Sequence, residues 1–385
     1  MAEKSISQQA MELENRYGAH NYHPIPVVID RGEGVFVWDV DGKKYFDFLS
    51  AYSAVNQGHC HPKIIQALTE QAKKLTLTSR AFYNSSLGEY EKFITQYFGY
   101  DKVLPMNTGA EGVETALKLC RKWAYEKKGV AQNEAKIVVC EGNFHGRTIS
   151  IISASTDPDS KNNFGPYTPG FIVIPYNNVE ALANALKDKN VAGFLVEPVQ
   201  GERGVVIPDE GYLTKCAELC KKNNVLLIAD EIQTGLGRTG KRLCSDHENV
   251  KPDILILGKA LSGGTMPVAA ILANDEIMLC IKPGEHGSTY GGNSLACKVA
   301  IASIKALEEE NMYENSNHLG KILLAELKKI QQERLDIVLT VRAKGLFAAI
   351  VIKERKNKSA WELCLDLKEN GLLAKPTHGD IIRLA

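Results

Sequence analysis

The sequence lacks any apolar run long enough to cross a membrane. The 385-residue chain is 44% hydrophobic, but none of its apolar stretches approaches the roughly 20 residues that a spanning helix needs. Residues 1–18 also lack an apolar core and contain three glutamates, which predicts neither a secretory signal nor a transit peptide. We therefore expect a cytoplasmic protein, with the mitochondrial matrix as the alternative if a presequence has been removed.

An excess of charge and a disulfide framework are also missing. The 46 Lys and Arg residues equal the 46 Asp and Glu residues in number, which argues against partners such as nucleic acid or a membrane surface. The nine cysteines show no framework spacing and predict reduced thiols. His59 and His61 have metal-ligand chemistry, but no second pair stands near them, so we predict no metal site. A small-molecule site with its own local charge remains.

What the sequence does contain is a series of short apolar runs in its central part. They are rich in Val, Ile and Leu without polar alternation, which is typical of strands buried on both faces of a mostly parallel sheet. The runs are Lys136–Cys140, Phe171–Pro175, Gly193–Val196, Val225–Ala229 and Ile254–Leu257. Apolar residues at helical spacing predict helices at Glu111–Lys122 and Tyr212–Asn223. The pattern predicts an α/β fold with a mostly parallel sheet flanked by helices.

The two ends of the chain have a different pattern. Residues 34–47 predict a hairpin around the turn Asp41-Gly42, and long helix-like stretches follow Asn293. A chain of this length usually forms more than one domain. We predict an N-terminal segment (1–55) that contributes to a small domain and to the active site, a large α/β domain (56–292) and a C-terminal small domain (293–385). Both ends would form one smaller α+β domain.

Two polar residues follow buried strands at the sheet edge where ligands bind in such folds. Asp230 comes directly after one apolar run and Lys259 follows another. A poorly hydrated lysine has a lowered pKa, so its neutral amine can condense with an aldehyde, and a carboxylate can hold a pyridine nitrogen protonated. Alternatively, Asp230 and Lys259 merely cap their strands or pair with each other. These two residues alone do not separate the interpretations.

Two glycine-containing segments are further candidates. The turn at 107–111 precedes a predicted helix, whose free N–H groups can bind a phosphate; an ordinary helix start capped by Thr108 is the alternative. Segment 235–241 (GLGRTGK) matches both a dinucleotide and a P-loop pattern. Arg242 stands where a P-loop needs Ser or Thr, and no helix pattern opens on the third glycine. We therefore expect neither nucleotide there.

In this order, the motifs resemble the pyridoxal-phosphate-dependent aminotransferases of class III, which act on ω-amino groups. The resemblance covers nearly the whole chain and rests on NTGAE (107–111), NFHGRT (143–148), VEPVQGE (196–202), ADEIQTGLGRTG (229–240), ILGKALSGG (256–264) and HGSTYGGN (286–293). It implies the type I, aspartate-aminotransferase-like fold. Residues 19–24 and 48–62 resemble the members that act on ornithine. Members that act on acetylornithine or 4-aminobutyrate share the central motifs and are the alternatives.

The resemblance implies roles around the cofactor, pyridoxal 5'-phosphate. Lys259 would bind the aldehyde and shuttle the proton, Asp230 would pair with the ring nitrogen, and Gln233 would reach the ring hydroxyl. Phe144 would stack on the ring.

The resemblance also implies how the phosphate is held. Thr108, Gly109 and Ala110 form the turn that would bind it, and Ser288 and Thr289 match residues that reach it from the other subunit. A homodimer with active sites shared across the interface is therefore implied.

Five residues match the substrate-binding positions of the ornithine-specific members. Tyr22 and Arg147 would hold the α-carboxylate of ornithine, and Tyr52 would line the same pocket. Glu202 would mask Arg383 while ornithine reacts and release it for 2-oxoglutarate. The implied reaction transfers the δ-amino group of L-ornithine to 2-oxoglutarate, giving L-glutamate 5-semialdehyde, which feeds proline metabolism, and L-glutamate.

Two departures from the family pattern carry expectations of their own. Arg203 stands where a small residue is expected, and a cation beside Glu202 would compete for it. The sequence ends soon after Arg383, where the family continues into a further helix, so the chain looks truncated and the placement of Arg383 is an open point.

Overall fold

The central body of the protein is a seven-stranded sheet. The computed structural model describes residues 4–353 and 358–385. In spatial order the sheet contains β4 (Lys102–Met106), β10 (Ala269–Ala273), β9 (Ile254–Leu257), β8 (Leu226–Asp230), β7 (Val191–Val196), β5 (Lys136–Cys140) and β6 (Phe171–Ile174). Strands β6, β5, β7, β8 and β9 are parallel, and only β10 runs against its neighbours β4 and β9. The predicted mostly parallel sheet and its five strands are confirmed.

The edge strand β4 and its neighbour β10 were not predicted. Pro105 lies inside β4, and proline normally argues against a strand because it cannot donate a ladder hydrogen bond. Strand β10 has the sequence AAILA, in which alanine gives little strand preference. Burial in the sheet overrides these weak local signals.

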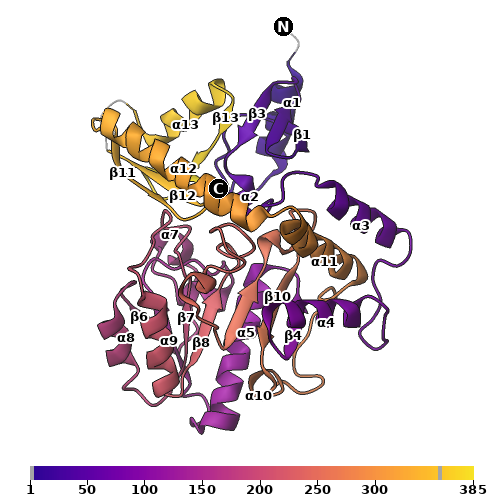
Figure 1. Ribbon diagram of the computed structural model, residues 1–385, viewed down its shortest axis with the longest axis vertical. Coiled ribbons are helices and arrows are strands. Elements are labelled where there is room, and N and C mark those ends of the chain that lie inside the picture. Colours follow the sequence, from indigo (N-terminus) through magenta and orange to yellow (C-terminus); the bar gives the residue numbers. More distant parts are fainter. Residues whose placement is uncertain (1–3, 354–357) are drawn as a thin grey trace.

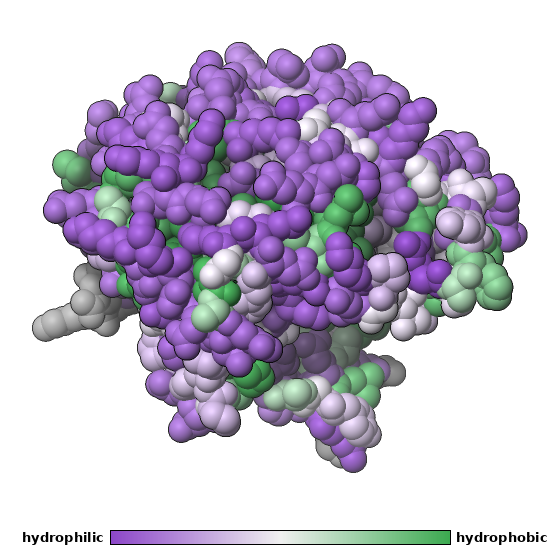
Figure 2. All heavy atoms as spheres, turned by 90° about the horizontal axis from the view of Figure 1, so that it is seen from below, coloured by the Kyte–Doolittle hydropathy of each residue, from purple (hydrophilic) through white to green (hydrophobic). Residues whose placement is uncertain are grey.

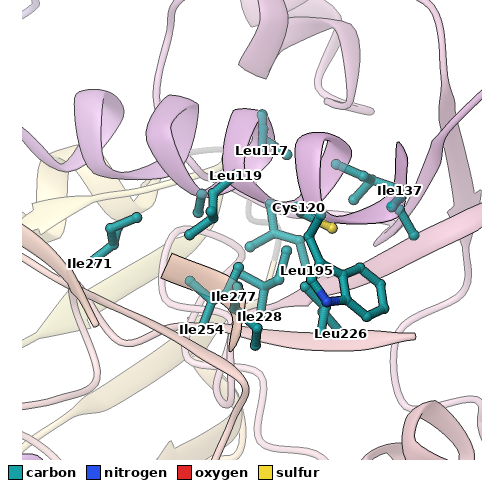
Figure 3. Close-up of a cluster of buried hydrophobic side chains, with 14 of the residues drawn as sticks. Leu117, Leu119, Cys120, Ile137, Leu195, Leu226, Ile228, Ile254, Ile271 and Ile277 are labelled. Carbon is teal, nitrogen blue, oxygen red and sulfur yellow. The ribbon is translucent and has the colours of Figure 1, made fainter. Parts of the chain in front are cut away.

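Helices cover both faces of this sheet, as predicted. Side chains alternate along β9: Ile254 and Ile256 belong to the core beneath α5 (Gly109–Trp123), whereas Leu255 and Leu257 pack toward α4 (Leu87–Phe98) and α11 (Ser294–Glu309). Figure 3 shows Cys120 of α5 directed at the strands. Each such buried Leu or Ile contributes about 1.5–3 kcal/mol. The second predicted helix is α9 (Tyr212–Lys222), which packs with α8 on the other face.

The remaining helices surround the sheet and the two ends of the chain. They are α1 (Ile6–Tyr17), α2 (Ser50–Ser53), α3 (Pro62–Ala72), α4 (Leu87–Phe98), α6 (Ile149–Ser153), α7 (Pro158–Lys161), α8 (Val179–Ala185), α10 (Asp275–Met278), α11 (Ser294–Glu309), α12 (Met312–Glu333) and α13 (Ala360–Glu369), with the π-turn η1 (Ala124–Lys128) and the 3-10 turns η2 (Ser245–Glu248) and η3 (Lys259–Ser262).

Two smaller sheets join the ends of the chain. The first contains β1 (Ile29–Glu33), β2 (Phe36–Asp39), β3 (Lys44–Asp47) and β13 (Leu372–Leu373); the second contains β11 (Val338–Ala343), β12 (Ala348–Ile352), β15 (Ile381–Leu384) and β14 (Lys375–Pro376). Strands β2 and β3 form the predicted hairpin, and β13 pairs in parallel with β3. Figure 1 shows both ends, in indigo and yellow, together above the central sheet.

The face of the molecule opposite these small sheets is mostly hydrophilic, with scattered apolar residues (Figure 2). Within residues 4–353 and 358–385, no helix has the length and hydropathy that a bilayer crossing requires. All nine cysteines are free thiols, as predicted.

Candidate active site

The carboxyl ends of β8 and β9 meet the start of α5 and enclose a cavity of about 190 Å³. Asp230 is the last residue of β8, and Lys259 follows β9 after one glycine. A Cβ atom on Gly258 would lie 3.7 Å from the Cα atom of Gly109. The two backbones are therefore in close approach, and the lysine, the aspartate and the glycine turn line one cavity. These are the residues that the sequence brought forward as candidates.

Lys259 occupies a strained position between two cavities. Its φ of 45° is in the left-handed region, which costs a non-glycine residue about 1–3 kcal/mol. The turn directs its half-buried side chain into this cavity and into a second one. Burial lowers the pKa of Lys259, and the charge of Arg383 adds to the effect, whereas Glu202 and Asp230 oppose it. A larger fraction of neutral, nucleophilic amine results.

Asp230 is oriented by a histidine that sequence reasoning did not assign. The Oδ2 atom of Asp230 lies 2.7 Å from Nδ1 of His145, and both side chains are buried. Burial disfavours protonation of His145, but the hydrogen bond and the negative charge of Asp230 together raise its pKa. The hydrogen bond from His145 fixes the Asp230 carboxylate at the wall of the cavity.

Glu197 is a second buried acid that the sequence reasoning missed. It follows β7 directly, lines the same cavity, and its Oε1 atom accepts a hydrogen bond of 2.9 Å from the N–H of Phe144. Burial raises the pKa of Glu197 to about 7. The signal was present in the sequence, because Glu197 follows the apolar run Gly193–Val196 just as Asp230 follows its own run.

The start of α5 forms the turn that the sequence analysis expected to bind a phosphate. Thr108 caps the helix by accepting a hydrogen bond from the N–H of Glu111, whose carboxylate accepts in return from the N–H of Thr108. Gly109 and Ala110 follow as the first helical residues and line the cavity. Their N–H groups have no intrahelical acceptor, since the first four amides of a helix never do, and the helix dipole favours an anion there.

A second cavity of about 460 Å³ opens beside the first and shares Lys259 and Phe144 with it. Its lining includes all five residues expected to bind substrate, namely Tyr22, Tyr52, Arg147, Glu202 and Arg383. Gln233 bridges the two cavities: it lines the first, and its amide donates to the carbonyl of Tyr52 at 3.3 Å.

Tyr52 is held by an unusual backbone turn. All four residues from Ser50 to Ser53 have positive φ values, with 60° at Tyr52. A left-handed turn of L-residues costs about 1–2 kcal/mol per residue, so surrounding contacts must compensate for it. One of them is the bond from Arg238 to the hydroxyl of Ser50. The turn places the Tyr52 ring 5.2 Å from the Arg383 guanidinium.

Arg383 and Glu202 form the expected ion pair. The Nη1 atom of Arg383 lies 2.5 Å from Oε1 of Glu202. Arg383 is 1% exposed, and β15 is paired on both sides, with β12 and β14. Burial raises the pKa of Glu202, but Arg383 more than offsets this and the pKa is lowered overall. The Nε atom of Arg383 is buried without a hydrogen-bond partner, which leaves a donor for a carboxylate.

Arg203 was expected to compete with Arg383 for Glu202, but in the structure it does not contact Glu202 through a salt bridge. Its guanidinium lies against Gly142 and donates to the carbonyl of Glu141 at 3.3 Å. Glu202 keeps its bond to Arg383. The side chains of Glu202 and Arg203 point in different directions, so their adjacency in the sequence did not predict an ion pair between them.

Three residues expected to bind the phosphate are not among the lining residues of the first cavity. Thr108 is exposed and serves as the helix cap. Ser288 accepts from the side-chain amide of Asn107 at 2.7 Å, and Thr289 is exposed. A contribution of Ser288 and Thr289 to another subunit remains a prediction.

The GLGRTGK segment and the two histidines near residue 60 have other surroundings in the described residues. Segment 235–241 opens no helix; it is a mostly buried loop whose Gly240 packs on Asn317 of α12. His59 bonds to Asp47, and His61 to Glu310. In the part of the chain that the structure describes, no three His, Cys, Asp or Glu side chains are grouped to hold a metal ion.

Known proteins with similar sequences and structures share this architecture. The chain matches the family Aminotransferase class-III over residues 17–385. It is 64% identical to a Drosophila ananassae protein named mitochondrial ornithine aminotransferase, over 99% of this chain and 87% of that protein. A Toxoplasma gondii ornithine aminotransferase, described with partial occupancy of PLP at its active site, has a TM-score of 0.97 at 46% identity and covers 100% of this chain and 93% of that chain. An Elizabethkingia anophelis acetylornithine aminotransferase has a TM-score of 0.90 at 59% identity, covering 99% and 94%.

Proposed function

Because the chain belongs to the class-III aminotransferases, we propose that it transfers the δ-amino group of L-ornithine to 2-oxoglutarate. The products are L-glutamate 5-semialdehyde and L-glutamate, and the semialdehyde cyclises toward proline. One observation carries the proposal: Lys259 lines both the cavity that contains Asp230 and the cavity that contains the Glu202–Arg383 pair. The Lys259 amine is therefore accessible both from the cavity with Asp230 and from a substrate pocket whose charge changes when the Glu202–Arg383 pair opens.

The protein uses pyridoxal 5'-phosphate, as its family does. The lining of the first cavity fits this cofactor, because an amine, a buried carboxylate, an aromatic face and a helix N-terminus surround one space. When bound, the cofactor supplies an aldehyde that accepts the amino group and a ring that serves as an electron sink. We assign the aldehyde to Lys259, the ring nitrogen to Asp230, the ring face to Phe144 and the phosphate to the N–H groups of Gly109 and Ala110. Gln233 would meet the ring hydroxyl.

In the first half-reaction, Arg147 and Tyr22 would hold the α-carboxylate of ornithine at the outer end of the second cavity. Binding of the α-carboxylate in this way would place the δ-amine of ornithine next to Lys259. The Nζ atom of Lys259 would act as the general base that accepts and holds the proton from the δ-carbon. A general base of this kind contributes about 10²–10⁴-fold to the rate. Glu202 neutralises Arg383 meanwhile.

In the second half-reaction the pocket must accept a dianion. Release of Arg383 from Glu202 would expose a guanidinium to the α-carboxylate of 2-oxoglutarate, while Arg147 holds the distal carboxylate. The buried and unpartnered Nε of Arg383 supports this role, since a guanidinium binds carboxylates through two parallel hydrogen bonds.

The substrate test compares half-reactions of the holoenzyme. We expect its visible absorption band to bleach rapidly with ornithine and to return with 2-oxoglutarate. N-acetylornithine is the second candidate, because an acetylornithine aminotransferase is 59% identical; 4-aminobutyrate is the third. Slow bleaching by ornithine relative to either compound would contradict the proposal.

We further propose a homodimer in which Ser288 and Thr289 complete the partner's phosphate site. Large exposed aromatic side chains support an interface: Tyr83, Phe82 and Tyr290 are 106%, 69% and 58% exposed. Mixing a Lys259→Ala subunit with a Ser288→Ala/Thr289→Ala subunit tests the idea. Sharing predicts one intact site per mixed dimer and a recovery of activity. No recovery would assign Ser288 and Thr289 to their own subunit.

The compartment is proposed on separate grounds. The mitochondrial matrix and the cytosol are the two candidates, and the Drosophila ananassae relative, which is named mitochondrial, favours the matrix. Fractionation of cells that express the natural gene decides between the two.

A further inference from the structure

The second cavity contains two carboxylates that the proposed reaction has not used. Asp157 and Asp159 line it together with Arg147. They lie where the chain enters α7, on the side of the cavity formed by the central α/β body. The inference drawn from them rests on the proposed function, because it concerns how ornithine is recognised.

The charges of ornithine leave one group without a partner. Its α-carboxylate is assigned to Arg147, and its δ-amine reacts at Lys259. The α-ammonium also enters the cavity, and a buried charge without a counter-charge is costly. Glu202 is occupied by Arg383. Among the described residues that line the cavity, Asp157 and Asp159 are the carboxylates that remain.

Position within the cavity selects Asp157. The α-ammonium and α-carboxylate of ornithine are bonded to the same carbon, so the acid that meets the former must lie near Arg147. Asp157 is half-buried, whereas Asp159 is exposed. Burial raises the pKa of Asp157, but bonds from Ser160 and the N–H of Asp159, and the charges of His378 and Arg147, more than offset this. Asp157 is therefore ionised at neutral pH.

Asp157 retains capacity for a ligand. Its Oδ1 accepts from the N–H of Asp159 at 3.1 Å, and its Oδ2 accepts from the hydroxyl of Ser160 at 2.6 Å. An ionised carboxylate offers about four acceptor sites, so two remain. The existing bonds fix the carboxylate in place, which lowers the entropic cost of binding.

We propose that Asp157 binds the α-ammonium of ornithine and so selects substrates with a free α-amino group. Acetylation converts this ammonium into a neutral amide, and 4-aminobutyrate has no such group. The residue thus discriminates among the ω-amino substrates that the shared chemistry at Lys259 would otherwise accept.

The test uses L-ornithine and 5-aminopentanoate, which is ornithine without its α-amino group. In the holoenzyme, Asp157→Asn should lower kcat/KM of the first half-reaction with ornithine by about 10- to 100-fold, the range for a hydrogen bond to a charged group. With 5-aminopentanoate the change should stay within about twofold, and the half-reaction with 2-oxoglutarate should not weaken. Asp159→Asn is the matched control and should change none of these by more than about twofold, as expected for an exposed charge.

A second variant separates recognition from the capping of α7. Asp157→Ser keeps an N-cap hydroxyl but removes the charge, and it should show the same selective loss for ornithine. Equal losses with ornithine and 5-aminopentanoate would assign Asp157 to structure alone and overturn the proposal, as would unchanged ornithine kinetics. If the unmodified enzyme itself fails to react with ornithine while it reacts with 5-aminopentanoate, the proposed function fails at an earlier step.

Discussion

The first cavity, called the cofactor cavity from here on, and the second, called the substrate cavity, share Lys259 and Phe144 but are built differently. The cofactor cavity lies at strand ends of one sheet, and its acids Asp230 and Glu197 are 4% and 6% exposed. The substrate cavity collects residues from distant segments, and its Tyr22 is 66% exposed. The first environment is fixed by the core of the sheet, and the second by loops that meet above it.

This difference follows from what each cavity must do. The cofactor site performs the same chemistry in both half-reactions, so a preorganised set of buried groups is an advantage. The substrate site must accept a cationic diamino acid and then a dianion. An ion pair between Glu202 and Arg383 can open or close without moving the sheet, which makes loops and a small sheet suitable supports. Substitutions in the two cavities should therefore fail in different ways.

The largest effect is expected at the shared residue. Lys259→Ala removes the side chain that we propose as both nucleophile and general base, so we expect kcat to fall by at least about 10⁴-fold in both half-reactions. Stopped-flow absorbance with each substrate measures this. Lys215→Ala, at an exposed position on α9, is the control. Full transamination by the Lys259→Ala variant would refute the mechanism.

A smaller but still symmetric loss is expected in the cofactor cavity. Asp230→Asn removes the charge that we propose faces the ring nitrogen, and it weakens the bond to His145, so both half-reactions should slow by about 10³-fold. The visible spectrum and its pH dependence should change with the rates. The control is Asp253→Asn, at the other end of the same strands, where the carboxylate accepts from the N–H of Leu227. A loss confined to one substrate would place Asp230 outside the ring chemistry.

The two cavities also differ in how far the sequence predicted them. Asp230 and Lys259 were accessible from hydrophobic patterning, because a polar residue directly after a buried strand lies at the ligand edge of a parallel sheet. Glu197 obeys the same rule and was overlooked. His145 has no such signal, since it lies in a loop and its role depends on the distance to Asp230, which the sequence does not contain.

The substrate cavity could be assigned only through family resemblance. Tyr22 and Arg383 lie 361 positions apart along the chain, and no periodicity connects them. The left-handed turn at Tyr52 contains no glycine, the residue that usually indicates such a conformation in a sequence. The edge strand β4 and its neighbour β10 were missed for a related reason: tertiary burial overrode a proline and an alanine-rich sequence.

In the substrate cavity, an asymmetric effect is expected. Glu202→Gln removes the charge that neutralises Arg383, which would then compete for the α-carboxylate of ornithine. We expect the ornithine half-reaction to slow by about 30-fold, the lower range for disrupting a buried ion pair, while the 2-oxoglutarate half-reaction changes little. Single-turnover kinetics with each substrate measure the ratio, and the exposed Glu210→Gln is the control. Equal slowing of both half-reactions would remove the distinction between the cavities.

The smallest effect is expected at Arg203, which adjoins Glu202 in sequence but not in pairing. Because its guanidinium bonds to the carbonyl of Glu141 rather than to Glu202, Arg203→Ser should leave the ratio of the two half-reaction rates within about twofold of the unmodified enzyme, as expected for an exposed charge. The same kinetics that report on Glu202→Gln measure it. A faster ornithine half-reaction in this variant would mean that Arg203 does compete for Glu202 during turnover, and the charge of the substrate cavity would then depend on three residues instead of two.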